Sequence, residues 1–148
     1  MKELVEKIES QITQIKQENV KLKNELEESV LNTERQIDAL VLDVIQVIDA
    51  YEKAESVVKE KGYCEDETAG KAIKRMMQPK KIVQSILTKF NVQCIDIENK
   101  LINENLCTVI DTEPDPSKED GLVISVEKNG YLRGERLIRR AEVIIVRN

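Results

Sequence analysis

The first part of the chain carries apolar residues at alternating steps of three and four. From Val5 to Leu26 these positions form a heptad seam, interrupted by one polar residue, Asn19. The residues between them are mostly Glu, Lys and Gln, which favour helix and keep the outer face in water. Because one helix cannot bury so narrow a stripe alone, we predict a parallel dimeric coiled coil over residues 1–36. Its expected seam contacts are Val5, Ile8, Ile12, Ile15, Asn19, Leu22 and Leu26.

Asn19 occupies an a position of this seam, where apolar residues are the rule. A buried amide at a lowers stability, but it can pair with its own copy across a two-stranded coil and so fix the register and the number of strands. The alternative is a tolerated polar residue in a frayed seam. The sequence leaves both interpretations open.

The rhythm changes after Leu22, where two successive steps of four form a stutter that locally unwinds a supercoil. Beyond Ile37 the stripe widens as further apolar residues join it, which is typical of a helix that passes from a coil into a bundle. We therefore predict a helical dimerisation region over residues 37–90, with four helices in the dimer. The expected dimer contacts here are Ile37, Leu40, Val44 and Val47.

A second helix is predicted over residues 69–90. The two glycines and acidic run of residues 62–70 indicate a loop before it, and Pro79 should break or restart the helix near Gln78. One face of this helix is apolar and the other is basic. A basic face of this kind is more often a solvated surface than a docking surface.

From Asn91 onward the apolar period becomes two, which indicates strands. The polar stretch 113–121, which contains Pro114, Pro116 and Gly121, is expected to form an exposed hairpin loop. The predicted fold class is therefore α+β: a long N-terminal helix, a helical bundle and a small antiparallel β domain over residues 91–148. The expected strand runs are 92–97, 106–111, 122–126 and 137–146.

The composition excludes several classes of function. The chain has no histidine, so histidine catalysis and histidine metal ligation are excluded. A net charge of −5 argues against a general nucleic-acid binder. Three widely spaced cysteines without a CxxC pair favour reduced thiols, and no apolar run approaches the length that spans a bilayer. We expect a cytoplasmic protein with no nucleic-acid or membrane partner.

No constellation of residues points to catalysis. Paired acids, nucleophile and base sets, phosphate loops and metal clusters are not recognisable, so we expect no enzyme activity, no cofactor and no metal. The arginine-rich stretch 130–140 is different, because Tyr and Arg are enriched at binding hot spots and arginine forks suit carboxylates. The alternative is that Tyr131 fills the β core and the arginines form a solvated rim.

In order and spacing, Gly130-Tyr131, Arg136, Ile138-Arg139, Ala141 and Val143 resemble the closing motif of the GrpE family, nucleotide exchange factors for Hsp70 chaperones. The helical segment 42–54 is similar to a second family segment that carries an Asp, an aromatic residue and an Ala. Arg140 stands at the usual proline position, and residues 103–107 replace a family segment before the third strand. The chain thus resembles a divergent member.

The resemblance implies a homodimer that binds the nucleotide-binding domain of an Hsp70 and opens its cleft to release ADP. It places Arg136 at the partner contact, whereas a structural role is the alternative for Arg139. A scaffold whose β tip tethers another protein without nucleotide exchange is the runner-up. The candidate partner-binding residues are Arg136, Tyr131, Arg133, Arg139 and Glu127.

Overall fold

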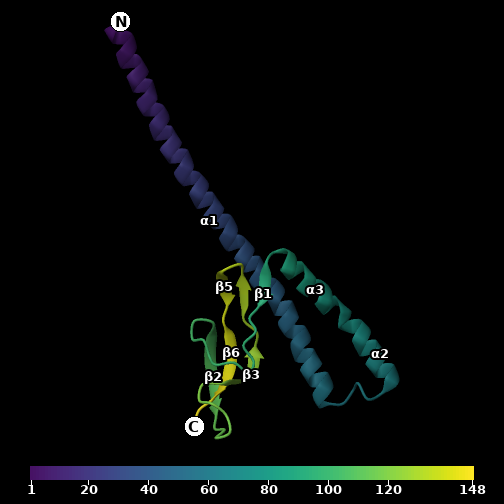
Figure 1. Ribbon diagram of the computed structural model, residues 1–148. Helices are drawn as coiled ribbons and strands as arrows, with labels where there is room; N and C mark the ends of the chain where they lie inside the picture. The colour runs from purple at the N-terminus through teal and green to yellow at the C-terminus, as the bar shows by residue number, and fades with distance from the viewer. The chain divides into compact units, whose positions relative to one another are not determined.

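A computed structural model describes all residues from 1 to 148 (Figure 1). The chain forms two compact units, Met1–Leu40 and Val41–Asn148. Helix α1 (Lys2–Glu60) supplies the whole of the first unit and continues into the second. The apolar seam residues between Val5 and Leu26 are 46% to 65% exposed. The long helix is thus confirmed, while its pairing with a second copy stays a prediction.

In the second unit the apolar residues of α1 lie on two faces of the helix, one buried and one partly exposed. Val41, Ile45 and Ile48 are buried, the last two completely. Val47 remains 46% exposed, and Val44 is half-buried. The chain therefore covers one face of this helix itself and leaves the predicted dimer contacts on the other face at least partly uncovered.

The second helical segment is divided, as predicted, into α2 (Glu67–Met76) and α3 (Gln78–Lys89). Pro79 lies in the first turn of α3, where a missing N–H is tolerated. Helix α2 begins earlier than expected because Asp66 caps it, its carboxylate accepting from the Ala69 N–H at 2.7 Å. The Lys80 to Glu55 ion pair, at 2.6 Å, ties α3 to α1.

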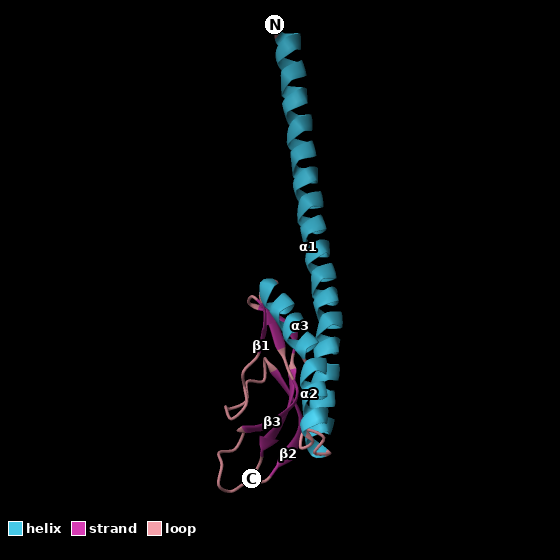
Figure 2. Cartoon of the chain, turned by 90° about the vertical axis from the view of Figure 1, so that its right-hand side faces the viewer, coloured by secondary structure: helices cyan, strands magenta, loops and turns pink.

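The β domain consists of two three-stranded sheets beside the helices (Figure 2). In the first sheet the strand order is β1-β4-β5, and both pairs are antiparallel. In the second the order is β2-β6-β3. The strands are β1 (Val92–Cys94), β2 (Cys107–Glu113), β3 (Val123–Lys128), β4 (Tyr131–Arg133), β5 (Arg136–Arg139) and β6 (Ala141–Val146).

Two details of the strand predictions are wrong. Strand β2 pairs with β6 in parallel, so the domain is not antiparallel throughout. Strands β2 and β3 flank β6 on opposite sides, so the segment 114–122 crosses the end of β6 instead of closing a hairpin, with the Gly121 N–H donating to the Val146 carbonyl at 2.9 Å. The alternation of apolar and polar residues predicts that a segment is a strand. Which strand pairs with it depends on residues far away in the chain.

Strand β6 lies at the centre of its sheet and organises the core. Ala141, Val143 and Val146 are completely buried, because the strand has neighbours on both edges and apolar residues above it. The predicted run 137–146 is divided at Arg140, so that β5 joins the first sheet and β6 the second. The buried core cluster is Ile95, Ile97, Cys107, Val123, Ala141 and Val143.

Candidate functional site

The arginine-rich stretch folds into a β-hairpin, which we call the arginine hairpin (β4, β5 and the turn Gly134–Glu135). Tyr131 is opposite Arg139 at its base, and Arg133 is opposite Arg136 at its tip. Gly134 has a φ of +61°, which favours glycine at this turn. The arginine-rich stretch is thus an ordered pair of short strands joined by a tight turn.

The tip of the arginine hairpin is held against the end of α3. The Gly134 N–H donates to the Asn91 carbonyl at 2.9 Å, and Val92 pairs with Arg133 in the neighbouring strand. Arg136 is exposed beside this contact, and Arg133 is half-buried. The two guanidinium groups therefore extend from a fixed backbone, which lowers the entropy lost when a partner binds.

Arg139, at the other end of β5, is engaged by α1. Its two terminal nitrogens donate to both carboxylate oxygens of Asp49 at 2.6 and 2.8 Å. Its Nε and Nη2 atoms also donate to the Asn129 carbonyl at 3.0 and 2.7 Å. The hydrogen bonds that Arg139 donates to Asp49 raise the pKa of Arg139, and partial burial opposes this rise. Forked hydrogen bonds between an arginine and a carboxylate are stronger than hydrogen bonds between neutral groups.

A second contact lies one turn further along α1. The Asn129 side-chain amide donates to the carboxylate of Glu52 at 3.0 and 3.1 Å. Tyr131 is buried beneath these groups, and the Arg139 guanidinium lies 5.5 Å from the centre of its ring. Burial, with nearby Cys94 and Glu52, raises the pKa of the Tyr131 phenol. We call this set of residues the helix-strand joint: Asp49, Glu52, Asn129, Tyr131 and Arg139.

The motif residues thus separate into two groups. Tyr131 and Arg139 lie in the helix-strand joint, whereas Arg133 and Arg136 lie at the tip of the hairpin. Asp49 and Glu52 lie in the family-like segment 42–54, but the sequence predicts no role for either of them or for Asn129. The sequence carries only a weak signal for this contact. Two acids three residues apart on α1 lie on one helix face, but their partners are far away along the chain.

Glu127 does not join the arginine hairpin. It lies exposed on β3, in the other sheet, and accepts a hydrogen bond from the Ser125 hydroxyl at 2.6 Å. Together with Asp49, Lys53 and Ser56 it borders a shallow hollow between α1 and the turn that follows β3. Glu127 and Arg136 therefore lie in different sheets.

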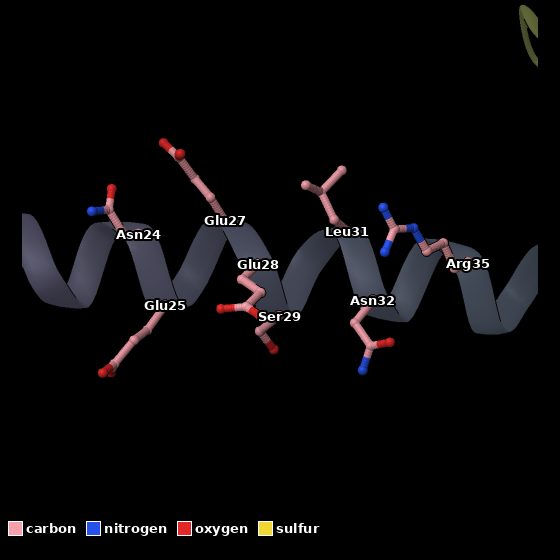
Figure 3. A pocket seen from close by; sticks show the side chains of 8 residues that line it. All are labelled: Asn24, Glu25, Glu27, Glu28, Ser29, Leu31, Asn32 and Arg35. Atoms are coloured by element: carbon pink, nitrogen blue, oxygen red, sulfur yellow. The ribbon is translucent and has the colours of Figure 1, made fainter.

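A hollow along the first unit has no binding geometry. Its eight lining side chains, from Asn24 to Arg35, extend to both sides of a single stretch of α1 (Figure 3). No second element faces them, so they form an open, mostly polar helix surface. A site that selects a ligand needs groups that converge, which these do not.

Other kinds of site are also not seen. No group of three or more His, Cys, Asp or Glu residues is placed to hold a metal ion. Every buried side-chain nitrogen or oxygen has a hydrogen-bond partner. None of the helices combines the length and the apolar character that crossing a membrane requires. The arginine hairpin and the exposed apolar faces of the helices are the surfaces with a recognisable binding character.

Comparisons with known proteins show which family the chain belongs to. The family model of GrpE matches residues 1–147. Protein GrpE from Francisella tularensis subsp. holarctica (strain OSU18) is 28% identical over 155 aligned positions, covering 99% of this chain and 77% of that protein. Protein GrpE from Francisella tularensis subsp. novicida (strain U112) is 26% identical with the same coverage. The chain therefore belongs to the GrpE family, whose members are co-chaperone nucleotide exchange factors of Hsp70.

Proposed function

We propose that the chain works as a homodimer that binds the nucleotide-binding domain of an Hsp70 through the arginine hairpin and opens the cleft, so that ADP leaves. Release by this route is differential binding: the factor must prefer the open, nucleotide-free state to the closed one. Bound nucleotide then weakens the complex by the same factor. No chemical step at a catalytic residue is needed.

The exposure of Arg136 on an anchored hairpin is the observation that carries this proposal. An arginine fork suits a carboxylate on a partner, and a fixed backbone presents it in one orientation. Arg133 lies opposite it in the strand register and supplies a second guanidinium at the same end. Tyr131 and Arg139 support the hairpin from behind, through burial and the contact with Asp49.

The homodimer is supported by the uncovered seam of α1. Helices in proteins gain most of their stability by packing an apolar face, and α1 exposes Ile8, Ile12 and Ile15 for such packing against another helix. The chain itself offers no element that covers these residues in the first unit, which consists of α1 alone. A second copy, aligned in parallel, would cover them in register.

The test is the release rate of a fluorescent ADP analogue from the host's Hsp70, measured with and without this protein. We expect strong acceleration by the unmodified chain, and a loss of at least about tenfold in Arg136→Ala, the factor equivalent to about 1.4 kcal/mol. Arg75→Ala removes an exposed arginine from α2 and is the matched control, expected to retain full activity. Binding without acceleration would favour the scaffold alternative.

A further inference from the structure

The arginine hairpin is attached to the helices at its two ends. At the tip, Gly134 donates to Asn91 at the end of α3. At the base, Arg139 is paired with Asp49 of α1. Because Arg136 and Arg139 are the two ends of β5, these attachments lie at opposite ends of one strand. Strand β1 pairs with β4 along its whole length, so the hairpin and β1 move as one sheet. Without the contact at the base, this sheet could pivot about the contact near Asn91.

The attachment at the base depends on charge. Asp49 and Arg139 keep only 24% and 16% of their side-chain surface exposed, and the carboxylate is bound by two arginine nitrogens at once. Glu52 adds an independent contact through Asn129, whose carbonyl is bound in turn by Arg139. The Asn129 turn is therefore linked to α1 by two routes, which restricts both sliding and rotation.

We propose that Asp49 and Glu52 are positioning residues for nucleotide exchange: they fix the angle between α1 and the arginine hairpin, and thereby make the bound factor distinguish the open Hsp70 from the closed one. This inference rests on the proposed function. A hairpin that pivots at its tip still presents Arg136 to a partner. It would adapt equally well to both states, and a ligand with equal affinity for two states shifts neither.

The proposal separates selectivity from binding. Loss of the base attachment leaves the tip contact between Gly134 and Asn91 intact, so contact with ADP-bound Hsp70 should persist. The extra affinity for nucleotide-free Hsp70 should fall, because it requires a hairpin of fixed angle. A residue that merely stabilised the fold would weaken both complexes together.

The experiment measures the affinity of the full chain for nucleotide-free and for ADP-bound Hsp70. In Asp49→Ala the ratio of the two affinities should fall by at least about fivefold, with the affinity for the ADP-bound form unchanged within about twofold. Asp49→Asn keeps one acceptor oxygen, so its affinity ratio should lie between those of the unmodified chain and Asp49→Ala. The control is Asp43→Ala, which removes an exposed acid from the same helix. An unchanged ratio in a folded Asp49→Ala variant would overturn the proposal.

A second measurement needs no Hsp70. Spin labels at the exposed positions Lys53 and Glu135 report the distance between α1 and the hairpin turn. The distribution should broaden in Asp49→Ala and in the double variant with Glu52→Ala, and stay narrow in Asp43→Ala. A narrow distribution in both joint variants would also overturn the proposal. Failure of the unmodified chain to accelerate ADP release would instead contradict the proposed function, while this distance measurement would still report on the joint.

Discussion

Gly130 and Ala141 approach so closely that no side chain fits between them. A Cβ placed on Gly130 would lie 2.6 Å from the Ala141 nitrogen and 3.0 Å from the Arg139 carbonyl oxygen. Both are backbone atoms at the junction of β5 and β6, so they cannot move aside as a flexible side chain would. The Gly130 carbonyl also accepts from the Ile95 N–H at 2.9 Å. Glycine is required at position 130 because there is no room for a Cβ atom, and not because the backbone has a left-handed φ.

Replacement of Gly130 by Ala should therefore destabilise the β domain. We expect Gly130→Ala to lower the free energy of unfolding by about 2 to 3 kcal/mol, the cost of overpacking a rigid site. Urea denaturation followed by circular dichroism measures the change. Gly70→Ala is the control: Gly70 lies in α2 and its nearest backbone contact would be 3.2 Å, so the gain in helix propensity should offset most of the strain. Equal losses in both variants would contradict this assignment.

The seam of α1 predicts which substitutions abolish dimer formation. Ile12→Asp and Ile15→Asp place a charge at positions that an adjacent helix would bury, so each should shift the protein toward monomer in sedimentation equilibrium. Gln17→Asp introduces the same side chain outside the seam, with a loss of helix propensity at least as large, and should leave the mass unchanged. A dimer that withstands both isoleucine substitutions would show that this seam is not the interface.

Asn19 distinguishes two interpretations of the coil. If its amide pairs across a dimer, Asn19→Ile should raise the melting temperature of the helix and also allow species larger than a dimer, because the constraint on strand number is lost. Thermal circular dichroism and sedimentation measure the two effects. A higher melting temperature with a strictly dimeric mass would favour the tolerated polar residue.

Cys94 should react slowly with alkylating reagents near neutral pH. Partial burial first, and then the Glu52 and Asp96 carboxylates, raise the pKa of its thiol, so that less of the reactive thiolate is present at a given pH. The alkylation rate should keep rising with pH above the range usual for a free cysteine.

The test uses a Cys64→Ser background, in which Cys94 is the exposed thiol because Cys107 is buried. Glu52→Gln should shift the dependence of the alkylation rate on pH to lower pH. Glu98→Gln is the control and should leave the pH dependence unchanged. An equal shift in both variants would exclude Glu52 as a specific cause of the raised thiol pKa.

The sequence alone predicts the elements whose signals are local. Heptad spacing defines the helix with its seam, Pro79 marks the break between α2 and α3, and alternation locates most of the strand residues. These features depend on residues within a turn or two of one another, so a short window contains the necessary information. The order of residues 130–143 was also sufficient to indicate the family.

Tertiary structure decided the strand partners and the roles within the motif. A parallel β2 and β6 pair is not encoded in either strand, because the pairing depends on the intervening strands. Arg136 and Arg139 look alike in the sequence, but the folded chain places Asp49, ninety positions away, against Arg139 and leaves Arg136 exposed. Periodicity specifies which face of an element is apolar, whereas the function of a charged side chain depends on what distant residue folding brings to it.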